Sequence, residues 1–138
     1  MSTSIKARWK ENMEFDVEMG DHTITIDAGQ ASGGNDNGPR PKPLMMAALA
    51  GCTGMDVVSI LKKMKVSYDE LDIEVIGYTT EEHPKHYYRM DVIYKFKGKD
   101  LPKDKIEKAI DLSKDKYCGV SAAYKKGMEL NYEIEIKE

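Results

Sequence analysis

The stretch "PLMMAALAGCTGMDVVSILKKMKV", Pro43 to Val66, is the most hydrophobic segment of this 138-residue chain. Pro43 suits the first turn of a helix, where the missing N–H leaves no hydrogen bond unmade. The segment predicts a helix over residues 44–65, apolar on nearly every side and therefore buried on most sides. It is long enough to span a membrane, but Asp56 at its centre and the lysines at its end argue against that. We interpret it as the core helix of a soluble protein.

The few polar residues of this helix form one stripe. They are spaced by four, three and four positions, which places them on one face: Cys52, Asp56, Ser59 and Lys63. Gly51 and Gly54 flank the cysteine, although each glycine costs a helix roughly 1 kcal/mol against alanine. Their presence indicates tight packing at this point or a ligand that approaches the backbone.

Strand patterns precede this helix. Residues 5–9, 13–19 and 22–27 alternate between apolar and polar side chains, with turn signals between them, and predict a three-stranded meander. Residues 28–43 are rich in glycine, proline, asparagine and aspartate. We expect them to form a loop of about 16 residues without regular structure, and loops of that length are usually functional or disordered.

Further elements follow the helix. Alternating patterns from Leu71 and from about Tyr87 predict two strands joined by "EHPK". An amphipathic helix is expected over residues 102–115 and a short one over 119–126, and "MELNYEIEIKE" predicts a final strand. The order βββ–α–ββ–α–α–β defines the class α+β in a single domain, residues 1–138.

The composition limits the function classes. Hydrophobic residues make up 41% and charged residues 33% of the chain, an ordinary globular mixture. A net charge of -3 and a pI near 5.7 suggest neither a nucleic-acid partner nor a membrane surface. The N-terminus lacks the apolar region of a signal peptide. We therefore expect a cytoplasmic protein whose two cysteines stay reduced.

Cys52 has two interpretations. It is either a small buried side chain or a reactive thiol. Asp56, one turn later, would raise the pKa of the thiol, and the helix start is too far away to lower it. A reactive Cys52 therefore needs a cation from elsewhere in the fold. Arg40, in the loop before the helix, is the first candidate, and Arg8 is the second.

Cys118 lies 66 positions after Cys52, in "DKYCGVSAA" at the junction of two predicted helices. Free N–H groups at a helix start can activate a thiol, but packing is an equal alternative. The separation is not that of a zinc finger, and His83 and His86 have no third partner at metal-ligand spacing. The loop is not a phosphate-binding motif. We expect no metal and no cofactor.

The stretches "PLMMAALAGCTGMDVVSILKK" and "LSKDKYCGVSAA", together with the cysteine separation and the element order, resemble the OsmC/Ohr family of osmotically inducible and organic hydroperoxide resistance proteins, and its OsmC-like subgroup in particular. The resemblance covers nearly the whole chain. It implies an intertwined homodimer with two long central helices between antiparallel sheets. It also implies a thiol peroxidase in which Cys52 attacks an organic hydroperoxide and Cys118 resolves the sulfenic acid.

One position departs from the family pattern. The family has a glutamate about nine or ten residues before its first cysteine, which orients a catalytic arginine from the N-terminal hairpin. Those positions hold Pro43 and Lys42, and Arg8 is the only arginine in that hairpin. This departure motivates an alternative: a non-catalytic member of the fold that binds a small hydrophobic ligand in its dimer pocket. A third hypothesis treats the cysteines as independent core residues. For a peroxidase, an unidentified dithiol reductant is expected as a partner.

Overall fold

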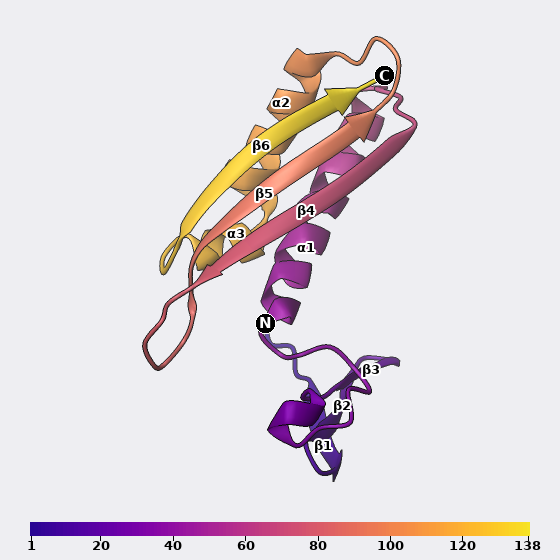
Figure 1. Ribbon diagram of the computed structural model, residues 1–138. Helices are drawn as coiled ribbons and strands as arrows, with labels where there is room; N and C mark the ends of the chain where they lie inside the picture. Colours follow the sequence, from indigo (N-terminus) through magenta and orange to yellow (C-terminus); the bar gives the residue numbers. More distant parts are fainter. The chain divides into compact units, whose positions relative to one another are not determined.

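The computed structural model describes residues 1–138, which form two compact units, residues 1–45 and 46–138 (Figure 1). The expectation of one domain over residues 1–138 stays a prediction.

The N-terminal unit is built on a three-stranded antiparallel sheet. It contains β1 (Lys6–Glu11), β2 (Glu14–Met19) and β3 (His22–Ile26), in the order β1-β2-β3. The turn between β2 and β3 contains Gly20 with a φ of 60°, a conformation that glycine adopts without cost. The predicted meander is confirmed.

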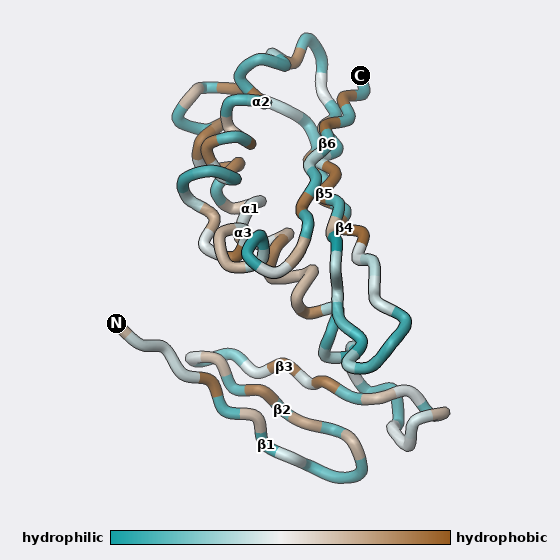
Figure 2. Tube along the Cα trace, turned by 90° about the vertical axis from the view of Figure 1, so that its left-hand side faces the viewer, coloured by the Kyte–Doolittle hydropathy of each residue, from teal (hydrophilic) through white to brown (hydrophobic).

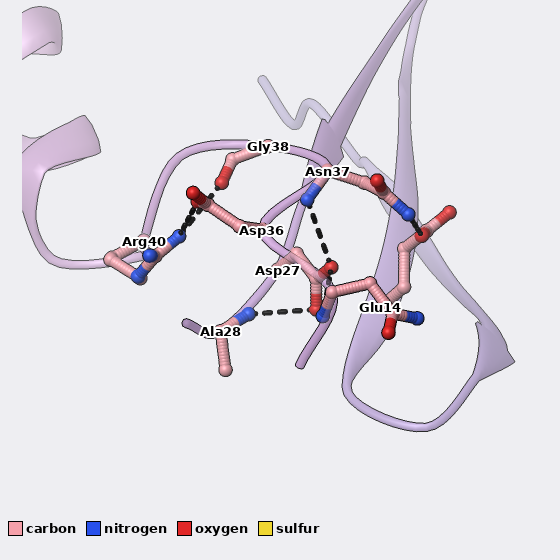
Figure 3. Close-up of polar contacts among 8 residues, drawn as sticks. Glu14, Asp27, Ala28, Asp36, Asn37, Gly38 and Arg40 are labelled. Atoms are coloured by element: carbon pink, nitrogen blue, oxygen red, sulfur yellow. Dashed lines mark hydrogen bonds and ion pairs between the residues drawn. The ribbon is translucent and has the colours of Figure 1, made fainter. Parts of the chain in front are cut away.

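Asp27 fixes the long loop that follows β3. Its buried carboxylate accepts backbone N–H groups from Ala28 at 2.7 Å and from Asn35 and Asn37 at 3.1 Å each (Figure 3). These hydrogen bonds, led by that of Asn37, hold the pKa of Asp27 below its usual range. The loop also contains one 3-10 turn, η1 (Gln30–Ser32), so the expectation of no regular element was wrong. Backbone hydrogen bonds therefore give a defined structure to a loop whose composition predicts only irregular structure.

The C-terminal unit contains most of α1 (Pro43–Lys63) and a second sheet. Its further elements, in chain order, are β4 (Glu70–Thr79), β5 (Tyr87–Lys97), α2 (Lys103–Leu112), the π-helical turn η2 (Ser113–Tyr117), α3 (Gly119–Tyr124) and β6 (Glu129–Lys137). Figures 1 and 2 show the three α-helices on one face of the sheet. This α+β architecture confirms the predicted class, and the helix and strand types agree with the sequence patterns.

The expectation of purely antiparallel sheets was wrong for one strand pair. The sheet has the order β4-β5-β6, and β4 pairs with β5 in antiparallel register. β6, however, runs parallel to β5, with Arg89 opposite Glu129 and Lys97 opposite Lys137 (Figure 1). The reason is the helical connection between these strands, which returns the chain to the end where β5 began.

The core lies between this sheet and its helices. It includes Leu49, Val57 and Leu61 of α1, Tyr94 and Phe96 of β5, and Ile106 of α2, all at most 2% exposed. The opposite side of α1 is different, because Met55 is 76% and Val58 45% exposed. The predicted burial of α1 on most sides is therefore wrong for the single chain.

By length and composition α1 could cross a membrane, but the core helix of a soluble protein passes the same test.

Candidate thiol site

The fold brings the two cysteines together. Cys52 lies in the third turn of α1, and Cys118 lies between η2 and α3. Their sulfur atoms and a carboxylate oxygen of Asp56 all lie within 4.8 Å of one another. Both cysteines are free thiols; Cys118 is buried and Cys52 half-buried. This proximity is what the family resemblance implies for the two cysteines, whose roles stay a prediction, and Asp56 shares the site with them.

A π-helical turn positions Cys118. After α2 the chain widens into η2, and the backbone N–H of Cys118 donates to the carbonyl of Ser113 at 2.7 Å. Cys118 then adopts an extended conformation, with φ -76° and ψ 101°, and its sulfur accepts the N–H of Ser121 at 3.4 Å. π-Helical turns occur frequently at functional sites, and this one turns the second thiol towards α1.

A chain of buried hydroxyl groups ends on Asp56. Tyr94 and Thr53 hydroxyls are 2.7 Å apart, Thr53 and Ser113 hydroxyls are 2.9 Å apart, and Ser113 Oγ donates to Asp56 Oδ2 at 3.0 Å. The Ser113 hydroxyl gives its one proton to Asp56 and therefore accepts from Thr53, which in turn accepts from Tyr94. Sequence analysis selected Asp56 but missed the three hydroxyls, because only the fold brings them together.

The pKa of the Cys52 thiol is raised. Burial is the main cause, and the hydrogen bond to Cys118 and the electrostatic interactions with Cys118 and Asp56 act in the same direction. The backbone N–H of Val120 acts in the opposite direction. None of these groups is a cation, so the surroundings of Cys52 in residues 46–138 favour the neutral thiol. The expected effect of Asp56 is confirmed.

The two arginines selected from the sequence belong to the N-terminal unit. Arg40 donates to Asp36 at 2.8 Å and to the carbonyl of Gly38 at 3.0 Å (Figure 3). Arg8 forms an exposed ion pair with Glu18 at 3.6 Å. A role for either arginine at Cys52 stays a prediction.

The two glycines beside Cys52 have different surroundings. A side chain at Gly54 would approach Ile73 Cδ1 to 2.9 Å, so this glycine permits close packing of α1 on β4. At Gly51 no atom lies within 4 Å of such a side chain. An open, mainly apolar groove of about 730 Å³ follows this side of α1. Its lining includes both glycines, Met55, Val58 and Leu71.

The C-terminal unit is thus an α+β fold in which a helix and a π-helical turn bring two free thiols together. This arrangement is typical of proteins with a pair of redox-active cysteines. The family model for OsmC-like proteins matches residues 33–133, and the chain belongs to that family. The resemblance found in the sequence is therefore confirmed.

The chain is also similar to a curated relative and to solved structures. The chain is 27% identical to protein YhfA of Escherichia coli K12 over 132 residues, 95% of this chain and 96% of YhfA. It is similar to a hypothetical protein from Aquifex aeolicus, with 27% identity, a TM-score of 0.87, and coverage of 100% and 98%. An organic hydroperoxide resistance protein from Legionella pneumophila has a similar fold at 17% identity, with a TM-score of 0.69 and coverage of 98% and 97%.

Proposed function

We propose that this protein is a thiol-dependent peroxidase that reduces organic hydroperoxides in the cytoplasm. The observation that carries the proposal is the proximity of the Cys52 and Cys118 sulfurs, within 4.8 Å, in a member of the OsmC-like family. The names of structural neighbours described as organic hydroperoxide resistance proteins support the substrate class.

The reaction has two thiol steps. The Cys52 thiolate attacks one oxygen of the peroxide, the O–O bond breaks, and the alkoxide leaves and takes a proton to become an alcohol. Cys52 is then a sulfenic acid. The Cys118 thiol attacks its sulfur, water leaves, and a disulfide forms. A dithiol reductant restores both thiols and is itself oxidised to a disulfide.

The distance suits the second step. A disulfide needs sulfurs about 2.05 Å apart, so the two thiols must approach by no more than roughly 3 Å. Cys118 lies in an extended segment between two helical elements rather than inside one, so a local backbone change can supply this movement.

The test compares three proteins after treatment with tert-butyl hydroperoxide under metal-free conditions. We expect the parent to lose two hydrogens and to yield one linked peptide pair containing Cys52 and Cys118. Cys118→Ser should instead accumulate a sulfenic acid at Cys52, which dimedone traps, and Cys52→Ser should do neither. Two free thiols that persist in the parent would refute the peroxidase.

The alternative is a non-catalytic protein that binds a small hydrophobic ligand. Two observations favour it: the raised pKa of Cys52 and the apolar groove along α1. The absence of the family glutamate at Lys42 and Pro43 points the same way. An unreactive parent that binds a fluorescent apolar probe, and loses that binding in Val58→Lys, would support this function.

A further inference from the structure

We propose that reduced Cys52, Cys118 and Asp56 form a binding site for Zn²⁺ or a divalent metal of similar softness. The proposal uses residues of the thiol site but does not depend on peroxidase activity. It also revises the expectation that the chain has no metal site. That expectation rested on spacing along the sequence, whereas the fold brings together residues 66 positions apart.

The distances are close to those of a zinc site. Zn–S bonds of about 2.3 Å in tetrahedral geometry place two thiolate sulfurs about 3.8 Å apart. The three ligand atoms here all lie within 4.8 Å of one another. A contraction of the sulfur–sulfur distance by at most about 1 Å would therefore bring the two thiols to zinc geometry. Cys52 and Asp56 are one helical turn apart on rigid α1, so Cys118 supplies the adjustable ligand.

The ligand types select the metal. Two thiolates favour zinc and copper(I) over magnesium and calcium, which prefer oxygen ligands. A carboxylate is a hard ligand and favours divalent zinc over copper(I). Three protein ligands leave a fourth position for water, as in zinc sites that remain open.

The charge of the metal-bound site favours a divalent cation. Metal binding displaces the protons of the two thiols, and the resulting thiolates and the Asp56 carboxylate then place three negative charges within a few ångströms, in a region where Cys118 is only 3% exposed. A divalent cation offsets two of these charges and converts the mutual repulsion into attraction. Cys52 and Asp56 are half-buried, which leaves the metal a route of entry.

The surrounding hydrogen bonds resemble the outer shell of a metal site. Ser113 holds Asp56 Oδ2 at 3.0 Å, and Thr53 and Tyr94 continue this chain into the core. Ser121 N–H contacts the Cys118 sulfur at 3.4 Å. Such partners orient the ligands, and their loss typically weakens metal affinity by about 10- to 100-fold.

The experiment titrates reduced protein with Co²⁺, without oxygen or peroxide, and then displaces the cobalt with Zn²⁺. We expect a sulfur-to-cobalt charge-transfer band in the near ultraviolet, saturation at one metal per chain, and bleaching by zinc but not by Mg²⁺. Native mass spectrometry should show one zinc bound with the loss of protons from the thiols.

Variants identify the ligands. Cys52→Ser and Cys118→Ser should each lose the tight site, and Asp56→Asn and Ser113→Ala should weaken zinc binding by about tenfold or more. Asp72→Asn, an exposed aspartate on β4, is the matched control and should bind as the parent does. No cobalt–sulfur band in the folded parent, or a band unchanged in both cysteine variants, would overturn the proposal. The cobalt titration of the parent is made without peroxide, and the peroxide assay is made with a chelator and therefore without metal. The metal-site proposal and the peroxidase proposal can therefore fail independently.

Discussion

At the scale of the residue, Cys52 presents a conflict between its surroundings and its proposed chemistry. The thiolate is the nucleophile, and an ordinary cysteine with a pKa near 8.5 is only a few per cent ionised at neutral pH. Burial, Cys118 and Asp56 raise the pKa of Cys52 and reduce that fraction further. A peroxidase therefore needs a cation at this thiol, and the N-terminal unit is where we expect it.

The contacts change which arginine we prefer. The sequence favoured Arg40 because the loop could carry it back to the helix, but its guanidinium already binds Asp36 and the Gly38 carbonyl. Both arginines have an exposed ion pair, and such pairs contribute between 0 and about 1 kcal/mol. Arg40 has a hydrogen bond to a carbonyl in addition, and Arg8 has the ion pair alone. Breaking this ion pair would therefore cost little, which makes Arg8 our preferred candidate.

We predict that Arg8→Ala raises the pH midpoint of Cys52 alkylation by about one unit or more, because an adjacent cation typically shifts a pKa by that amount. The rate of alkylation, followed by mass spectrometry with a chelator present, gives the midpoint. Arg8→Lys keeps the charge and should retain most of the effect, and Arg40→Ala should leave the midpoint unchanged. A parent midpoint at or above 8.5 that neither alanine variant moves would favour the ligand-binding function.

At the scale of the element, hydroxyl groups join α1, β5 and η2. Thr53, Tyr94 and Ser113 come from these three elements and are all fully buried. Each bond satisfies a polar group that would otherwise be costly in the core. The network thus fixes the relative positions of the elements that carry Cys52 and Cys118.

We predict that Thr53→Val lowers the free energy of unfolding by about 1–3 kcal/mol, although it keeps the shape of the side chain, because it leaves the Tyr94 hydroxyl without its acceptor. Urea denaturation followed by circular dichroism measures this change. Thr53→Ser, which keeps the hydroxyl and loses only a methyl group, should cost about 1 kcal/mol. A larger loss in Thr53→Ser than in Thr53→Val would show that packing, not the network, holds these elements.

The helices and strands could be predicted from local sequence patterns. The direction of β6 and the hydroxyl chain could not, because they depend on contacts between residues far apart in the sequence. The apolar run from Pro43 and the alternation in β4, β5 and β6 each depend on neighbours in sequence, so helix and strand types were predictable. The direction of β6 depends on where the helical connection returns the chain. Likewise, the hydroxyl chain joins residues 41 and 60 positions apart. The two cysteines were found because the thiol is rare, and the family resemblance supplied their pairing.

At the scale of the whole molecule, one side of α1 has no cover within residues 46–138. Met55 and Val58 are exposed beside the apolar groove, on a helix whose mean hydropathy is that of a core element. Water contact with so much apolar surface is unfavourable, and contiguous patches of this kind mark interaction sites. The family resemblance implies that a second copy of the chain is involved.

We predict a homodimer, with a mass in solution of twice the 15.6 kDa chain, measurable by multi-angle light scattering at micromolar concentration. A charge placed in the core of an interface is costly, so Met55→Lys should shift the population towards monomer. Because Met55 is 76% exposed, the same change should leave the secondary structure of each chain intact. Tyr88→Lys, at a side chain 50% exposed on β5, is the control and should remain dimeric. A parent that is monomeric at this concentration would contradict the intertwined architecture, because a dimer of that type requires an interface of at least about 1,200 Å².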